Sequence, residues 1–370
     1  MIEILLIYFL IPLVKVAGIV LILSGAIAYL TLLERKLIAH IQVRLGPMRV
    51  GWHGLLQPIA DGLKFLLKED IVPAKADAFI FTIAPAISLI PAFLVFAVVP
   101  FGPPDMFQGL LRWTLSWVPD RVLDAATTER VVQNSIASGG FVTDINIALL
   151  FVLSVSSVGI LGVILGGWAS NSIYPLLGAL RSTAQMVSYE VALGFSVIGV
   201  LLWAGSLSLV EIVQNQQEAH LWYFFVQPLA FGIFFICGLA ETNRLPFDFA
   251  EAETELVGGF HTEYSGFRFS LFFLAEYANM ITVSAIGVTL FWGGWLRPFP
   301  SFEWLWFLDF IPGVVWFLAK VFLWLYAFIW IRGTLPRIRF DHLMLFGWKV
   351  FLPLALGNVI VSAGVLLAFL

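Results

Sequence analysis

The sequence has little charge. Lys, Arg, Asp and Glu together make up 12% of its 370 residues, and 60% of the residues are hydrophobic, whereas an ordinary soluble domain is about 25% charged. Apolar runs recur along the whole chain, and each is long enough to cross the roughly 30 Å of hydrocarbon in a bilayer. These features exclude a water-soluble globular protein.

Cysteine and cofactor-binding motifs are also scarce. The single cysteine, Cys237, excludes an intrachain disulfide, and also a zinc or iron–sulfur site carried by this chain alone. The histidines fall at or outside the ends of the apolar runs, so no imidazole pair is placed to hold a haem. Neither GxxxxGK[ST] nor GxGxxG after a strand occurs. We therefore expect no catalytic redox centre and no metal site on this chain.

The apolar runs predict an all-α, polytopic helical membrane protein. Strands of a membrane barrel alternate polar and apolar residues, whereas these runs are apolar on every face. Helices satisfy their own backbone hydrogen bonds in lipid. We expect residues 1–370 to form a single integral membrane domain with about eight transmembrane helices, at 4–33, 78–101, 145–168, 188–209, 221–240, 269–292, 310–331 and 346–369.

Basic residues divide the connecting loops into two groups. Fourteen of the 20 Lys and Arg lie on four loops or, in the case of Lys349, just after one, and only four lie on the opposite side. The positive-inside rule places the basic group in the cytoplasm, with both chain ends outside. The expected inner loops are 34–77, 169–187, 241–268 and 332–345, and an outer insertion covers about 102–144.

Two inner segments have the pattern of amphipathic helices. From Trp52 onward, apolar residues recur at helical spacing, with Asp61 and Lys64 on the opposite face. The segment YPLLGALRSTAQMVSYE places Arg181 and Gln185 on one face and leads into Glu190. Such helices lie in the membrane interface rather than crossing it. We therefore expect amphipathic interfacial helices on the inner side.

Acidic residues concentrate in one stretch, 241–276. This stretch contains seven acidic residues and only two basic ones, Arg244 and Arg268. Its formal charge is therefore −5, in a chain whose total is −4. Asp248, Glu251 and Glu255 share one face if the segment is helical. Carboxylates crowded at a membrane boundary raise the pKa values of their neighbours, which is the chemistry of a proton relay. A solvated acidic loop is the alternative, but phenylalanines and glycines interleave the acids and favour a buried segment.

Extended motifs cover all four inner loops and the adjoining spans. They are LLERK with QVRLGP, GLLQPIADGLKFLLKED, GWASNS with LGALRSTAQMVSYE, ETNRLPFDFAEAETELVGGFHTEYSG, and LPRIRFDHLM with GWKVFLPL. On these motifs the chain resembles the membrane subunit of proton-pumping NADH:quinone oxidoreductase, respiratory complex I, which in mitochondria is called NADH dehydrogenase subunit 1. In two departures, residues 106–140 resemble an insertion, and Ile173 stands where a lysine is expected.

The resemblance implies a non-redox subunit that joins the redox arm to the membrane arm. It would form the quinone access tunnel and a carboxylate relay that links quinone reduction to proton translocation. The implied quinone-tunnel residues are Arg35, Arg44, Asp61, Arg181, Gln185, Arg244 and Arg332. The implied proton-relay residues are Glu190, Glu241, Asp248, Glu251, Glu253, Glu255, Glu263 and Glu276.

The resemblance also implies the cofactors and partners. The substrate is ubiquinone or menaquinone, while FMN and iron–sulfur clusters belong to partner subunits. The implied partners are the quinone-site and iron–sulfur subunits of the peripheral arm, small membrane subunits, antiporter-like subunits and membrane lipid, without nucleic acid. The implied location is the bacterial cytoplasmic (inner) membrane rather than the mitochondrial inner membrane.

Two alternatives remain open from the sequence alone. A homologous subunit of a membrane-bound hydrogenase shares these loops but uses no quinone, and a secondary ion-coupled transporter could use the acidic stretch as its ion site. The long charged inner loops favour a docking subunit over a stand-alone carrier. Co-purification separates the three: flavin and iron–sulfur subunits indicate complex I, a nickel subunit indicates a hydrogenase, and isolation favours a transporter.

Overall fold

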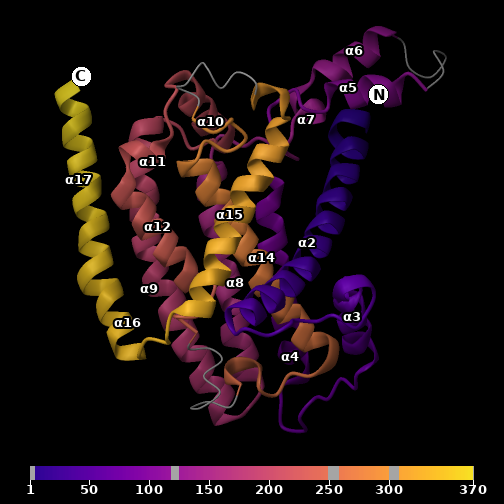
Figure 1. Ribbon diagram of the computed structural model, residues 1–370, viewed down its shortest axis with the longest axis vertical. Coiled ribbons are helices and arrows are strands. Elements are labelled where there is room, and N and C mark those ends of the chain that lie inside the picture. The colour runs from indigo at the N-terminus through magenta and orange to yellow at the C-terminus, as the bar shows by residue number, and fades with distance from the viewer. Residues whose placement is uncertain (1–4, 118–124, 249–257, 300–307, 370) are drawn as a thin grey trace.

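The computed structural model describes residues 5–117, 125–248, 258–299 and 308–369, and every regular element in these ranges is a helix (Figure 1). Within them, seven helices are long and apolar enough to cross a membrane. These helices are Leu6–Ile41, Ala78–Ala97, Ala148–Ala169, Ile173–Ala204, Gly266–Phe291, Gly313–Thr334 and Phe340–Ala368. The all-α, polytopic class predicted from hydropathy is confirmed.

The remaining expected span is present in two pieces. Helix α11 covers Tyr223–Val226 and α12 covers Pro228–Glu241, separated at Gln227. Asn358 Nδ2 donates to Gln227 Oε1 over 2.7 Å, and Gln227 Nε2 donates to Ser362 Oγ over 2.7 Å. Polar groups at this break are therefore satisfied by the C-terminal helix α17 (Leu352–Phe369), as buried backbone and amide groups in lipid require.

Two spans extend further than the hydropathy predicts, at the end that the basic residues predict to face the cytoplasm. Helix α2 (Ile11–Ile41), which follows the π-helical turn η1 (Leu6–Leu10), runs eight residues past the expected end at 33. Helix α9 (Ile173–Ala204) takes in most of the segment expected as the inner loop 169–187. Their polar residues lie on continuous helices, because backbone hydrogen bonding continues where the apolar run stops.

The connection after α2 contains the helix predicted for the membrane surface. A short turn, η2 (Trp52–Gly54), is followed by α3 (Gln57–Leu67), which packs against α2 and α14. Its apolar side chains Ile59, Leu63 and Leu67 are exposed. An exposed apolar face on an amphipathic helix fits the membrane interface.

Helix α14 (Gly266–Phe291) lies at the centre of the bundle and packs against α4, α12 and α15 (Figure 1). Helix α4 (Ala78–Leu94, continued by η3, Val95–Ala97) begins after Asp77, whose carboxylate accepts from two backbone N–H groups. It packs along α8 (Ala148–Ala169), where a Cβ on Gly162 would lie 2.2 Å from Ser88 Oγ. Small residues thus allow close helix contact, as is common in membrane bundles.

A lysine inside one span has a structural partner. Lys320 of α15 (Gly313–Thr334) donates to the carbonyls of Trp292, Gly294 and Leu296, at 2.6, 3.0 and 2.6 Å. These carbonyls follow the C-terminal end of α14, where a cation is favourable. The charge therefore caps a helix end rather than standing alone in the membrane.

Shorter helices complete the two ends of the bundle. The outer connection after α4 forms α5 (Gln108–Leu115), α6 (Ala125–Gln133) and α7 (Ser135–Ser138), which lie beside the N-terminal end of α2 (Figure 1). Helix α10 (Leu209–Glu218) follows α9. At the other end, η4 (Gly259–His261) packs on α9, and α16 (Phe340–Phe346) with η6 (Gly347–Phe351) leads into α17.

Candidate functional site

An ion pair links the inner end of α2 to α3. Arg35 Nη1 lies 2.6 Å from Asp61 Oδ2, and Gln57 Nε2 donates to Asp61 Oδ1 over 3.0 Å. The Arg35 side chain is 50% exposed, so the pair contributes only about 0–1 kcal/mol to stability. Arg44 is also exposed, and its Nε donates to Gln42 Oε1 over 2.7 Å. These groups remain accessible to a ligand at the membrane surface.

Deeper in the protein, five side chains form what we call the Glu34 cluster: Glu34, Arg244, Glu276, Tyr277 and Arg332. Arg332 pairs with Glu34 Oε1, Arg244 Nη1 lies 3.5 Å from the same oxygen, and Tyr277 donates to Glu34 Oε2 over 2.7 Å. Arg244 Nε lies 2.8 Å from Glu276 Oε1. Arg244 is therefore shared between two carboxylates on different helices.

The Glu34 cluster places charged side chains in the interior of a membrane protein, where such side chains are rare. The Glu34 and Arg244 side chains are each 5% exposed, so both ions are removed from water. Two carboxylates balance two guanidinium groups, and Arg244 also lies 4.1 Å from the centroid of the Tyr277 ring. Buried ion pairs are weak evidence for stability because desolvation offsets their attraction. Charged groups retained inside a membrane bundle point instead to function.

The local fold explains how Arg244 reaches this position. Arg244 lies in the turn after α12, and Gln185 of α9 binds the backbone of that turn. Gln185 Nε2 donates to the carbonyls of Ala240 and Phe247, each over 2.8 Å. Gln185, predicted as a quinone-tunnel residue, is fully buried and positions the backbone that carries Arg244.

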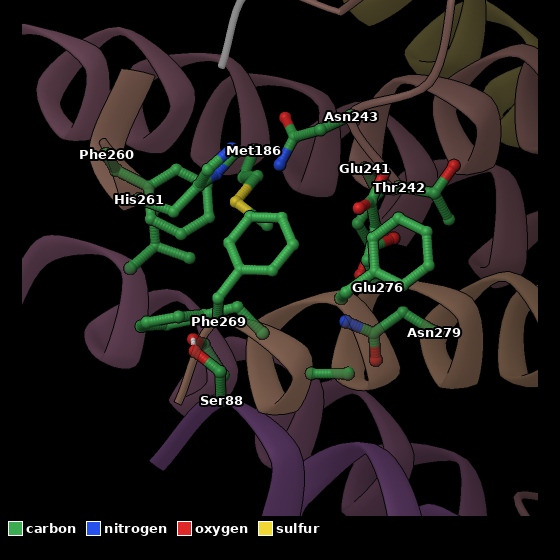
Figure 2. A pocket seen from close by; sticks show the side chains of 15 residues that line it. Ser88, Met186, Glu241, Thr242, Asn243, Phe260, His261, Phe269, Glu276 and Asn279 are labelled. Carbon is green, nitrogen blue, oxygen red and sulfur yellow. Dashed lines mark hydrogen bonds between the residues drawn. The ribbon is translucent and has the colours of Figure 1, made fainter. Parts of the chain in front are cut away.

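A cavity of about 50 Å³ adjoins the Glu34 cluster (Figure 2). Both Glu241 and Glu276 line it, so the second carboxylate belongs to the cluster and to the cavity. The other polar groups in its wall are Ser88, Thr242, Asn243, His261 and Asn279. A polar cavity holds water once it exceeds roughly 10–15 Å³. The volume of this cavity is enough for more than one water molecule beside the two carboxylates, and phenylalanine side chains form much of the remaining wall.

His261 forms the side of the cavity opposite the carboxylates (Figure 2). Its turn, η4, packs so closely on α9 that a Cβ on Gly178 would lie 2.8 Å from the backbone of Gly259. The imidazole is in edge contact with the rings of Phe260 and Phe269. Burial lowers the pKa of His261 to about 4, so the ring is neutral near pH 7 and can donate one hydrogen bond and accept another.

Glu190 extends this arrangement along α9. Ser157 of α8 donates to Glu190 Oε1, which fixes the carboxylate between the two helices. Helix α9 packs against α12, which carries Glu241. Arg244 thus joins Glu34 to Glu276, and Glu276 and Glu241 line the same cavity.

The predicted residues differ in where they lie. Arg244, Arg332 and Glu276 belong to the Glu34 cluster, Glu241 lines the cavity beside it, and Glu190 accepts a hydrogen bond from Ser157. Arg35, Arg44 and Asp61 lie at the α2–α3 surface, while Arg181 contacts the Phe340 ring, 6.0 Å from its centroid. Asp248 and Glu263 are half-buried. Glu251, Glu253 and Glu255 lie outside the described residues. Among the described residues, no group of three His, Cys, Asp or Glu could hold a metal ion.

Sequence reasoning does not single out Glu34, Tyr277 or His261. The apolar pattern ends the first span at residue 33 and so places Glu34 in an inner loop, whereas α2 continues to Ile41. The position of Glu34 directly before Arg35, inside a continuous helix, is the signal that could have identified it. Tyr277 follows Glu276 in the same helix, and a buried tyrosine hydroxyl requires a partner.

Comparisons with known proteins find similar sequences that match nearly the whole chain. The sequence model of a family described as NADH dehydrogenase matches residues 14–363. The chain is 51% identical to an H-type subunit of NADH-quinone oxidoreductase from Geobacter sulfurreducens, over 96% of this chain and 95% of that protein. It is 50% identical to the corresponding protein of Geobacter metallireducens over the same shares, 96% and 95%. It is 48% identical to that of Rhizobium meliloti, over 94% and 95%.

Proposed function

The chain belongs to the NADH dehydrogenase family, as a membrane subunit of NADH-quinone oxidoreductase, and on that premise we propose that it couples quinone reduction to proton movement in this enzyme. Its quinone access path would run along Arg35, Arg44 and Asp61 to the Glu34 cluster. Its proton relay would continue through Glu276, the cavity, Glu241 and Glu190. The family membership disfavours the stand-alone transporter considered above.

One observation carries this proposal: Arg244 contacts carboxylates on both sides. It faces Glu34, which is also held by Arg332 and Tyr277, and it pairs with Glu276, which lines the cavity. Because guanidinium groups stay charged and donate several hydrogen bonds, Arg244 can be attracted to whichever neighbour carries more negative charge. A change of charge on one side therefore changes the electrostatic environment on the other.

Quinone chemistry supplies such a change. Reduction takes two electrons from partner subunits and two protons, and it yields a quinol. Negative charge that develops on the quinone competes with Glu34 for Arg244 and Arg332. Glu276 then loses part of its countercharge, and the proton occupancy of the coupled carboxylates around the cavity changes.

The wider assignments follow from the same proposal. FMN and iron–sulfur clusters would belong to partner subunits of the peripheral arm, and the substrate would be ubiquinone or menaquinone. Small membrane subunits and antiporter-like subunits would receive the coupling along the membrane. The membrane would be the bacterial cytoplasmic one. Within it, residues 1–370 would form one integral domain with inner loops near 34–77, 169–187, 241–268 and 332–345.

The access path is tested by Arg44→Ala. We expect the apparent KM for quinone to rise about tenfold, because a hydrogen bond to a charged group contributes about 1.5–3 kcal/mol and 1.4 kcal/mol corresponds to a factor of ten. NADH oxidation by ferricyanide should persist, since it bypasses the quinone. The measurement is steady-state kinetics with both acceptors, and Arg112→Ala on the opposite side is the matched control. An unchanged KM would remove Arg44 from the path.

The orientation is tested by cysteine labelling. The 14-to-4 distribution of basic residues places Lys68 inside and the loop containing Glu218 outside. In whole cells, a membrane-impermeant maleimide should label Glu218→Cys but not Lys68→Cys, which should react only after permeabilisation. The native Cys237 is buried and gives little background. Labelling of Lys68→Cys from outside would invert the proposed topology.

A further inference from the structure

Helix α5, in the outer insertion, carries an exposed apolar stripe. Leu110 and Trp113 lie in α5 and Trp117 lies in the turn directly after it; they are spaced three and four residues apart and are 58%, 62% and 74% exposed. This spacing places them on one face of a helix. The two indole rings contact each other edge to face, with centroids 5.5 Å apart. No helix in the described part of the chain covers this stripe, which we call the tryptophan stripe.

The other faces of α5 are already used. Leu111 and Leu115 pack against Ile7 and Ile11 of the first span and against Val131 and Val132 of α6. On the polar side, Arg112 pairs with Glu129 of α6 over 2.7 Å, and Ser116 is exposed. Helix α5 is therefore held in a fixed rotation. The tryptophan stripe is the face left over after packing and salt-bridge formation.

The contacts of α5 also fix its depth in the membrane. Lys15, in the first span, lies 5.5 Å from the Phe107 ring at the start of α5 and donates to the carbonyls of Gly139 and Phe141. The first span covers 36 residues, about 54 Å at 1.5 Å per residue, which exceeds the roughly 30 Å hydrocarbon core. Because Lys15 and its carbonyl partners form a polar level near the start of this long span, we place its first turns, and α5 beside them, at the membrane interface.

We propose that the tryptophan stripe of α5 is a lipid-binding surface that anchors the outer insertion in the outer interface of the bilayer. Tryptophan is the residue enriched at this level, because its ring is apolar and its N–H reaches the headgroups. Leu111, next to the stripe on α5, packs against Ile7 of the first span, whose chain neighbours Tyr8 and Phe9 are 61% and 63% exposed. A membrane-spanning helix places that surface against lipid, so the adjoining stripe meets the same lipid.

The test is spin labelling in the assembled enzyme within native-lipid vesicles. Nitroxide labels are attached at Leu110→Cys, Trp113→Cys and Trp117→Cys, with Ser116→Cys as the control on the polar face. Enzyme without an introduced cysteine provides the background signal. Labels on the stripe should be relaxed more by oxygen, which concentrates in lipid, than by a water-soluble nickel chelate. The label at position 116 should show the opposite preference.

Two outcomes would overturn the proposal. Labels on the stripe that are immobilised and shielded from both relaxants would show that a protein subunit covers the stripe. Labels relaxed mainly by the nickel chelate would show that the stripe faces water. All four positions are exposed, so these substitutions leave the packing of α5 on the first span intact.

Discussion

Replacing Glu34 by alanine is expected to reduce quinone-linked NADH oxidation to less than about a tenth of the parent rate, since 1.4 kcal/mol already corresponds to a factor of ten. The change leaves Arg332 and Arg244 facing each other without the carboxylate that both contact. Breaking a buried ion pair on one side costs about 3–5 kcal/mol, because the remaining charge stays in a poorly solvated place. We expect the Arg332 side chain to rotate toward water. The Glu34 cluster, where the proposed quinone access path ends, would then no longer be held together.

Glu34→Gln provides the matched comparison. Glutamine keeps the shape and can still accept from Tyr277, which donates to Glu34 Oε2 over 2.7 Å in the parent. It removes the negative charge, so quinone activity should fall less than in Glu34→Ala but should not recover fully. Both variants are measured per assembled enzyme, with ferricyanide reduction reporting intact partner subunits. Full quinone activity in Glu34→Ala would show that the Glu34 cluster is only structural.

The second large effect is expected from Glu241→Gln. Glu241 lines the cavity that Glu276 also lines, so it is the carboxylate through which a proton would leave the Glu34 cluster. An amide has the same shape but does not titrate, and a positioned proton-transfer group contributes about 10²–10⁴-fold to a rate. We therefore expect quinone-linked NADH oxidation to fall at least about tenfold. The measurement is the steady-state rate in membranes containing the assembled enzyme.

Glu218→Gln is the control for this substitution. Glu218 is an exposed carboxylate at the end of α10, and it is not among the residues that line the cavity. It loses the same charge by the same chemical change, so its quinone-linked rate should stay at the parent level. Equal losses in both variants would point to a general effect of charge on assembly rather than to a relay.

The sequence was sufficient for the fold class because the bilayer imposes a simple rule. Each run of about twenty apolar residues must form a helix, and the described residues follow this rule at seven of the eight expected spans, while the span expected at 221–240 is broken at Gln227. Helix ends were less predictable. A hydropathy pattern stops where polar residues begin, but the helices α2 and α9 continue as hydrogen-bonded structures beyond the apolar run.

The candidate site was predictable in composition but not in its pairing. The concentration of acids identified Glu276 and Glu241 as candidates, and the family resemblance supplied Arg244 and Arg332. Their partnership with Glu34 depends on contacts across 210 and 243 residues, to Arg244 and Tyr277. No local pattern encodes such contacts, because they result from how α2, α12, α14 and α15 pack. The error at the end of the first span then hid the residue at the centre of the cluster.

In our proposal, these buried carboxylates couple quinone reduction to proton movement. The Glu241→Gln variant is the sharpest test of this coupling. Quinone-linked NADH oxidation and membrane potential are measured simultaneously in vesicles containing Glu241→Gln enzyme, with parent and Glu218→Gln enzyme alongside. We expect Glu241→Gln to lose both activities together while ferricyanide reduction persists, and Glu218→Gln to match the parent. Parent-level oxidation together with parent-level membrane potential in Glu241→Gln would contradict the coupling role of these carboxylates.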